Sequence, residues 1–354
     1  MDNVTSRVIS FIRFPMIAAV VAIHCNFIII NPELESRYLF SILFSITLKL
    51  IWVSVPIFFF ISGLLFFKEG TFNISLYKSK LRKRFYTIFI PYIIWNIIYF
   101  CIVCLQQFFK PDLLLLLHKR IIDFNWTDYL WIFWDIRQIS HLPDDQPACL
   151  VGVFWFIQCL FVTSLLSPVI YKIIKFTRHF FLLIFIALCF IDFKIDIPGI
   201  NNVGIAYFCL GAYVSIMRIN FVNYLRRIPI FISIITVFIC SFSVFIENEY
   251  LDFLFTMLLQ VGVFSMITYL INKDYCHENT LLTSSVFFIF AVHRLFTAPL
   301  MHIADRIVSY IKIDILLYTY YLLTITTAIL LSIALFWVMN KYMPKVTGIL
   351  NGRR

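Results

Sequence analysis

Residues Arg7 to Ile30 read RVISFIRFPMIAAVVAIHCNFIII, an apolar run that carries two ionisable side chains, Arg13 and His24. A membrane-spanning helix needs about 20 apolar residues, and an ionisable group inside one is expensive, which makes it a candidate functional residue. Eleven residue steps separate the pair, and at about 100° per step both side chains share one helix face. The helical rise places them roughly 16 Å apart along the axis. One membrane helix therefore presents a cation and, far from it, a base.

Two structural explanations compete with this functional interpretation. Arg13 can be a flanking residue whose side chain reaches toward water, and His24 can be a hydrogen-bonding residue between packed helices. A lone membrane histidine is weak evidence for a site. A cation and a histidine on one helix face favour a functional pair more strongly.

The composition excludes a soluble globular protein. The chain is 62% hydrophobic and only 14% charged, with a mean hydropathy of +0.92, whereas soluble domains contain about 25% charged residues. The net charge of +10 is explained by basic cytoplasmic loops, and no nucleic-acid-binding patch is found. No metal site is expected, and the nine cysteines are interpreted as small apolar residues. The expected partners are the lipid bilayer and a substrate, not nucleic acid, and the sequence contains no signal for an oligomeric state.

Ten apolar segments predict an all-α, polytopic bundle of about ten transmembrane helices, in a single domain over residues 1–354. An external loop is expected at about 110–149, where Trp126, Trp131 and Asp128 mix aromatic faces with carboxylates. This mixture fits stacking on sugars and fits an interfacial aromatic belt equally well. The ten segments are 7–30, 45–67, 85–108, 150–172, 179–192, 202–217, 228–246, 250–271, 282–304 and 314–340.

Basic residues are distributed unevenly between alternate loops. If the first residue is cytoplasmic, eighteen Lys and Arg residues fall in cytoplasmic regions and eight in external loops. The positive-inside rule then predicts that both termini are cytoplasmic, and the even number of helices agrees. The eight external residues are Arg37, Lys110, Lys119, Arg120, Arg137, Lys194, Arg306 and Lys312.

Six short motifs follow one another along the chain. The first is the pair Arg13 and His24. The other motifs are Val55 to Gly63 (VPIFFFISG), Lys83-Arg84 followed by Pro91-Tyr92, Trp155-Phe156, Phe208 to Tyr213 (FCLGAY) and Phe287 to His293 (FFIFAVH). Together they resemble the acyltransferase 3 family of integral membrane acyltransferases, and the resemblance covers almost the whole chain. Arg294 stands where the family usually has proline, which bears on the role of His293.

The resemblance implies an O-acetyltransferase-like enzyme of the bacterial cytoplasmic membrane. It would move an acyl group, expected to be acetyl, from cytoplasmic acyl-CoA to a saccharide or lipid-linked glycan hydroxyl, with no permanently bound cofactor. His24 would be the general base or, alternatively, the acyl carrier, and Arg13 would bind the anionic donor. Six further candidates for donor or substrate binding, each also explicable by packing, are Arg84, Lys83, Ser62, Tyr92, Trp155 and His293.

Two other functions compete with an acyltransferase. An exporter of polysaccharide or of a small solute is the first, and inverted repeats with discontinuous helices would favour it. The second is a catalytically inactive relative that serves in assembly. The presence of both Arg13 and His24 argues against the latter.

Overall fold

The computed structural model describes residues 3–111, 117–141, 148–190, 197–246 and 248–352, and among these residues it contains helices and no β-strand. Seven helical segments are long and apolar enough to cross a membrane, and three shorter apolar helices accompany them. The prediction of an all-α, multi-pass bundle with about ten membrane helices is thus confirmed for this part of the chain. The described residues cluster into two compact units, 3–58 with 220–344, and 59–219 with 345–352.

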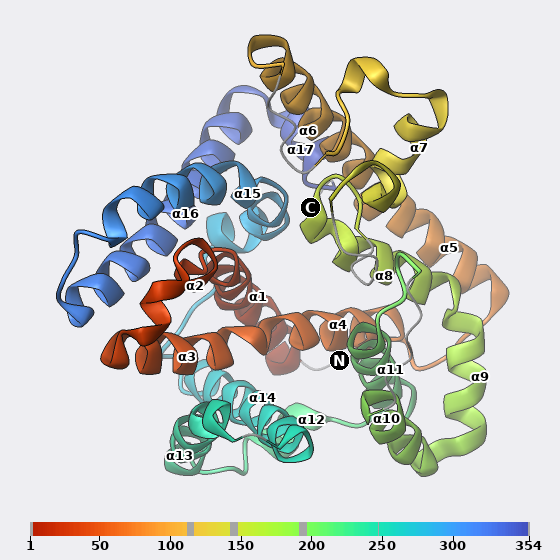
Figure 1. Cartoon of the computed structure of the whole chain (residues 1–354). Helices are drawn as coiled ribbons and strands as arrows, with labels where there is room; N and C mark the ends of the chain where they lie inside the picture. Colours follow the sequence, from red (N-terminus) through yellow and green to blue (C-terminus); the bar gives the residue numbers. More distant parts are fainter. Residues whose placement is uncertain (1–2, 112–116, 142–147, 191–196, 247, 353–354) are drawn as a thin grey trace. The chain divides into compact units, whose positions relative to one another are not determined.

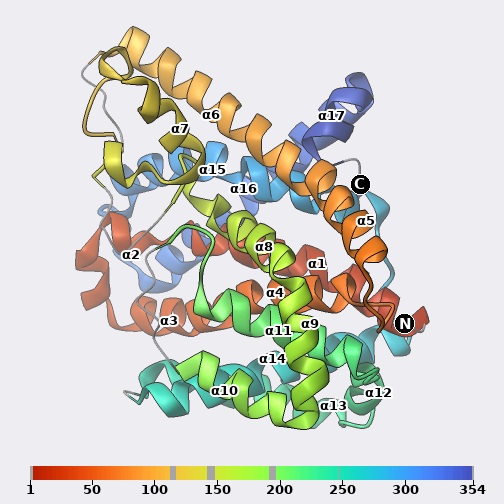
Figure 2. The same cartoon turned by 90° about the vertical axis from the view of Figure 1, so that its right-hand side faces the viewer.

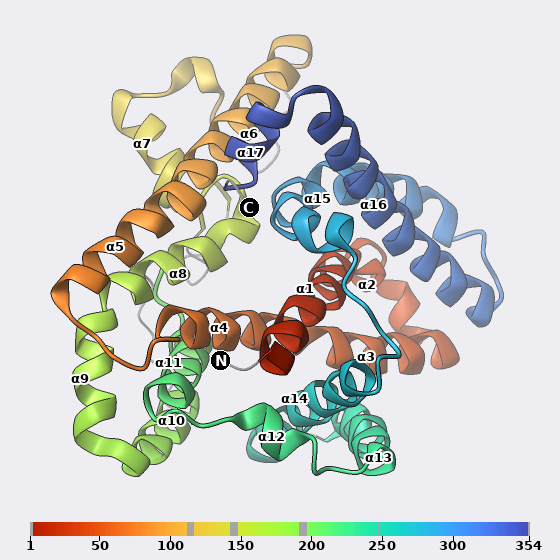
Figure 3. The same cartoon turned by 180° about the vertical axis from the view of Figure 1, so that it is seen from behind.

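The first unit combines the beginning of the chain with its last long helices. α1 (Asn3–Ile23) packs against α15 (Thr280–Val308), and α15 lies beside α16 (Asp314–Tyr342), as Figure 1 and Figure 3 show. α13 (Ile230–Ser241) and α14 (Glu249–Asn272) form a second pair. The shorter helices of this unit are α2 (Phe27–Ile30), α3 (Tyr38–Trp52) and α12 (Phe221–Leu225).

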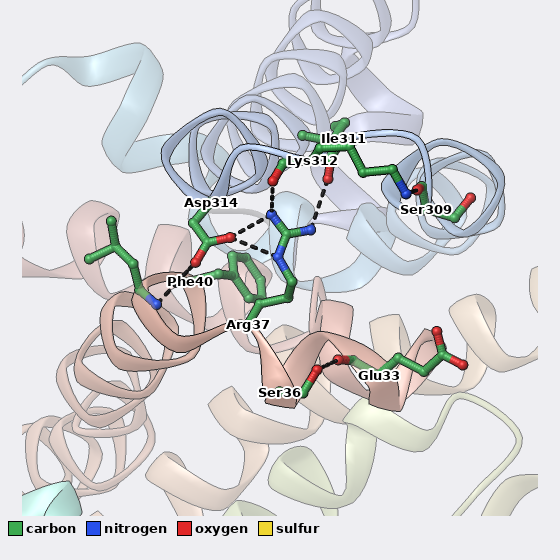
Figure 4. A network of polar contacts seen from close by, with 9 residues as sticks. Glu33, Ser36, Arg37, Phe40, Ser309, Ile311, Lys312 and Asp314 are labelled. Atoms are coloured by element: carbon green, nitrogen blue, oxygen red, sulfur yellow. Dashed lines mark hydrogen bonds and ion pairs between the residues drawn. The ribbon is translucent and has the colours of Figure 1, made fainter.

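An arginine–aspartate clasp joins two loops of the first unit. Arg37 Nε donates to Asp314 Oδ1 over 2.7 Å, and the same guanidinium donates to the carbonyl oxygens of Ile311 and Lys312 (Figure 4). Asp314 Oδ2 also accepts from the backbone N–H of Phe40, at 3.3 Å. Hydrogen bonds between charged groups are stronger than those between neutral groups. The bonds between Arg37 and Asp314 therefore fix the start of α3 against the start of α16.

The first predicted span is interrupted at its histidine. α1 ends at Ile23, and His24 and Cys25 lie in a turn. The Asn26 side chain then accepts from the backbone N–H of Ile28, at 3.0 Å, and so caps α2. Asparagine competes with helix continuation by this local bond. His24 therefore sits at a helix break.

The predicted span at 45–67 breaks near a proline. α3 and α4 (Ser54–Phe66) are separated at Val53, because Pro56 has no N–H to bond the carbonyl of the fourth residue before it.

The prediction of one continuous helix over 150–172 was wrong, because the structure has two helices there. α8 (Trp155–Leu165) and α9 (Ser167–Thr177) are separate helices that meet at Leu166. Pro168 has no N–H for the carbonyl of Ser164, so the α-helical hydrogen bonding stops there.

The second unit contains one continuous helical rod. α5 (Ile74–Arg84), a π-helical turn (Phe85–Phe89) and α6 (Ile90–Phe109) follow one another without a gap, as Figure 2 shows. In the turn the Ile90 N–H bonds the carbonyl of Phe85, and Pro91 cannot donate to the next carbonyl. The remaining helices of this unit are α4, α7 (Trp126–Trp134), α8, α9, α10 (Phe181–Phe190) and α11 (Asn202–Ile216).

The segment after α16 returns to the second unit. In α17 (Pro344–Leu350) the Leu350 carbonyl accepts from Trp95 Nε1, at 3.1 Å. Gly352 follows with φ +68°, and a Cβ there would lie 2.1 Å from the Thr87 carbonyl oxygen. Residues 345–352 are therefore packed against the π-helical turn and α6.

Candidate functional site

Two polar contacts connect the start of α1 to the segment that leads into α15. Arg7 Nη2 pairs with Asp274 Oδ1 at 2.7 Å, and Ser10 Oγ donates to Glu278 Oε2 at 2.9 Å. α1 and α15 then continue side by side. α15 is therefore a neighbour of the helix that carries Arg13 and ends beside His24.

Arg13 is partly buried in α1, and its charge interacts electrostatically with Glu278. Within the described residues the guanidinium makes no hydrogen bond to another side chain or to the backbone. A guanidinium has five N–H donors in a planar fork that matches carboxylate and phosphate groups. Arg13 thus keeps its donors available for an anionic ligand.

His24 is held in its turn by two buried neighbours. Cys25 and Phe27 are completely buried, and the Phe27 ring packs edge to face on Tyr321, with centroids 5.4 Å apart. The His24 imidazole faces His293 of α15, at a ring-centroid distance of 5.2 Å. Two candidate histidines from distant parts of the sequence therefore meet in the first unit.

His293 is completely buried and is hydrogen-bonded on one side only. Its Nδ1 lies 3.1 Å from the carbonyl oxygen of Ile289 and 2.8 Å from that of Phe290. Carbonyl oxygens only accept, so Nδ1 carries the proton and Nε2 has the lone pair. Among the described residues Nε2 has no hydrogen-bond partner.

The sequence interpretation missed the part that Arg294 plays in this cluster. Its charge interacts electrostatically with His24, Cys25 and His293. The side chain is partly buried, and it forms no hydrogen bond or ion pair in the part of the chain that the structure describes. A second arginine inside a predicted span was the signal available in the sequence. The first unit thus brings His24, His293 and Arg294 together, and Arg13 lies further along α1 near Glu278. We refer to these four residues as the α1–α15 cluster.

Lys49 is a further membrane cation that the sequence interpretation did not consider. Its Nζ lies 2.5 Å from Asp252 Oδ1 and 2.7 Å from Thr256 Oγ1, which joins α3 to α14. The side chain is 9% exposed. Because carboxylate and hydroxyl satisfy the ammonium, Lys49 is explained as a structural ion pair between helices.

In the second unit the candidates Arg84 and Ser62 bind each other. Arg84 Nη2 donates to Ser62 Oγ at 2.9 Å, and Nη1 donates to Ser164 Oγ at 2.6 Å. The guanidinium also lies over the Phe66 ring, 4.7 Å from its centroid. These contacts join α4, the α5 end and α8, and they support a packing role for both residues.

The other candidates of the second unit have mixed surroundings. Tyr92 is buried, donates to the Phe133 carbonyl and accepts from Gln158 Nε2 at 3.2 Å. The Trp155 ring lies 6.0 Å from that of Phe59. Lys83 is exposed. Tyr92 is therefore explained by protein contacts, whereas Lys83 remains open to solvent.

The loop predicted to be external contains an aromatic helix, α7. Asp128 forms a capping box with Asn125 at its start and accepts from Lys119 Nζ at 2.6 Å. Burial would raise the pKa of the Asp128 carboxyl, but the bonds from Lys119 and Asn125 lower it below its ordinary value. Trp126 is 75% exposed. Sugar stacking and an interfacial position both remain compatible with that exposure.

Comparison with known proteins agrees with the motifs. The model of the acyltransferase domain family (acyltransferase 3) matches residues 8–341. No curated protein and no solved structure matches the chain. The matched range covers most of both units and includes all four residues of the α1–α15 cluster, Arg13, His24, His293 and Arg294.

Proposed function

Because this chain belongs to the acyltransferase 3 family and is a multi-pass membrane acyltransferase, we propose that it transfers an acetyl group from cytoplasmic acyl-CoA to a hydroxyl of a saccharide or lipid-linked glycan. The observation that carries this proposal is the α1–α15 cluster. In this cluster the guanidinium donors of Arg13 are not used by any described residue. His24 lies at a helix break, and its ring faces that of His293. The donor is a substrate, and no permanently bound cofactor takes part.

Arg13 is proposed to bind a phosphate group of the donor. A bidentate guanidinium–phosphate pair is stronger and more directional than a neutral hydrogen bond. A pantetheine arm has about the length of the roughly 16 Å that helical rise gives between Arg13 and His24. A nucleotide held at Arg13 would therefore deliver its thioester to the level of His24.

His24 is proposed to act as general base. Imidazole is suited to proton transfer near neutral pH. His24 takes the proton of the acceptor hydroxyl while the oxygen attacks the thioester carbonyl carbon. The C–S bond of the resulting tetrahedral oxyanion then breaks, and the CoA thiolate takes the proton back from His24. An ester and free CoA are the products.

Arg294 supplies a positive charge close to this reaction. Its electrostatic interaction with both imidazoles means that negative charge on a tetrahedral intermediate next to His24 would be stabilised. Such stabilisation of developing charge is usually the largest single contribution to catalysis.

The orientation follows the charge distribution of the loops. We place both termini in the cytoplasm and the protein in the bacterial cytoplasmic membrane, as one acyltransferase domain. The Arg7–Asp274 contact joins two segments assigned to the cytoplasmic side, and the Arg37–Asp314 clasp joins two segments assigned to the outside. Both contacts are compatible with this topology.

The test is reconstitution in nanodiscs with labelled acetyl-CoA and a panel of saccharide and lipid-linked acceptors. Wild type should form labelled ester and release CoA, and His24→Asn should do neither.

The helix breaks at His24 and Val53 are of the kind that an exporter would use, so the same protein is also assayed for glycan export in proteoliposomes. Export without ester formation by wild type would contradict the proposal.

A further inference from the structure

The buried side of His293 contains an acceptor that the structure leaves unused. Nε2 has no hydrogen-bond partner in the described part of the chain, although the residue has no exposed surface. Buried polar groups are nearly always paired, and an unpaired one in a native protein requires an explanation. The Nδ1 proton is already committed to the carbonyls of Ile289 and Phe290. Nε2 can therefore only accept.

The imidazole of His24 lies beside that of His293. The two ring centroids are 5.2 Å apart and the ring planes are inclined by 34°. This separation leaves a hydrogen bond from a ring N–H of His24 to His293 Nε2 within reach of a rotation of the His24 side chain. Arg294 is the charged group next to both rings, and Cys25 and Tyr321 are the adjacent titratable groups.

We propose that His293 is the positioning residue of the site: its Nε2 accepts a hydrogen bond from one ring nitrogen of His24 and thereby keeps the other nitrogen unprotonated and directed at the acceptor hydroxyl. This inference rests on the proposed function of His24 as base. Backbone carbonyls of α15 fix the His293 tautomer, and His293 fixes that of His24. His293 thus fixes the tautomer and orientation of His24, as a carboxylate does for a histidine in other sites.

The direct test reads the tautomer rather than the activity. Nitrogen NMR of protein labelled in histidine should show one defined tautomer for His24, identified by its loss in His24→Asn. In His293→Leu the same signals should shift to a mixture of tautomers. A single, unchanged His24 tautomer in His293→Leu would overturn the proposal. This result is independent of whether any acyl donor is turned over, so it fails separately from the proposed function.

Kinetics provide the second test. His293→Leu should lower kcat by about tenfold to a hundredfold, the usual effect of removing an orienting partner from a functional histidine, with little change in KM for acyl-CoA. His293→Gln places an amide oxygen near the position of Nε2 and should recover most of kcat, whereas His293→Asn mimics only Nδ1 and should not.

Thr297→Val is the matched control, because Thr297 lies one turn further along α15, is equally buried and also has an unpartnered side-chain oxygen. It should leave kcat and the His24 tautomer unchanged. Equal kcat for the Gln, Asn and Leu variants would show that an acceptor at Nε2 is irrelevant and would overturn the proposal.

Discussion

Gly63 of α4 and Gly211 of α11 face each other across a backbone contact in the second unit. A Cβ on Gly63 would lie 1.9 Å from the Phe208 carbonyl oxygen, and one on Gly211 would lie 2.0 Å from that of Phe60. Each glycine therefore makes room for the other helix, as small residues do in membrane helix pairs. Two motifs that are distant in the sequence form one crossing.

Gly63→Ala and Gly211→Ala should each destabilise the protein. The added methyl group meets rigid backbone, and overpacking of this kind costs about 1–3 kcal/mol. Thermal unfolding in detergent, followed by fluorescence, measures the effect. Gly152→Ala is the control, since a Cβ there meets nothing within 4 Å, and it should unfold like wild type. Wild-type stability in both crossing variants would contradict the close approach of α4 and α11.

Arg13→Ala should lower the affinity for acyl-CoA at least about tenfold, because a hydrogen bond to a charged group contributes about 1.5–3 kcal/mol. Arg13→Lys should recover little, since a point charge does not replace a bidentate fork. Calorimetric titration with a non-hydrolysable acyl-CoA analogue measures the affinity. Arg7→Gln serves as control, because Arg7 makes an exposed ion pair with Asp274 of small energetic value. Undiminished affinity in Arg13→Ala would remove Arg13 from the donor site.

His24→Asn should lower kcat by at least about a hundredfold, the usual contribution of a positioned base, because an amide cannot take up the proton. Binding of acyl-CoA should be retained, since Arg13 is unchanged. His302→Asn is the control on α15, where His302 is exposed, and it should keep wild-type turnover. Substantial activity in His24→Asn would show that His24 is not the base and would leave it as a packing residue.

Asp128→Asn should make the external loop more susceptible to proteolysis at neutral pH. The folded-state pKa of Asp128 is lowered, so its stabilising contribution is present above the unfolded pKa of about 3.9 and is lost as the pH falls through the folded value. Wild type and variant should therefore differ at pH 7 and converge as the pH falls below the lowered pKa of Asp128. Asp123→Asn, in an exposed pair with Arg120, should behave like wild type at every pH. A difference that is constant with pH would rule out the carboxylate as its cause.

Ser79→Cys should react with a membrane-impermeant maleimide only from the cytoplasm, and Trp126→Cys only from outside. Both positions are exposed, and the charge distribution of the loops assigns them to opposite sides. Intact and inverted vesicles of a variant without the native cysteines distinguish the two. Labelling of Trp126→Cys from the cytoplasm would reverse the orientation and with it the side of the donor.

The apolar pattern was sufficient to predict the helices, because helix formation depends on local sequence. The helix face shared by Arg13 and His24 stays a prediction, since α1 ends at Ile23, one residue before His24. The helix breaks at Val53 and Leu166 could also have been predicted from the sequence, because Pro56 and Pro168 follow them. They were overlooked because the apolar run continues across each proline, and hydropathy alone does not register a missing backbone N–H.

The partners of the polar residues could not be predicted in the same way. The contact of His24 with His293, and the bond of Arg84 to Ser62, depend on how helices far apart in the chain pack together. A sequence motif identifies a polar residue but not whether a neighbour will satisfy it. Arg84 and Arg13 look equivalent in the sequence, yet one is bonded to two serines and the other has free donors.

The bond between Trp95 and Leu350 has a consequence for biosynthesis. Residues 220–344, which belong to the first unit, are synthesised between the two segments of the second, so the ribosome makes Leu350, the partner of Trp95, only after it has made those residues. The first unit is likewise divided, since residues 59–219 separate its two segments. Neither unit can complete its packing from an unbroken stretch of nascent chain. The first unit can be completed only after its last segment, which ends at Pro344, has been synthesised, and the second only after Leu350 has followed.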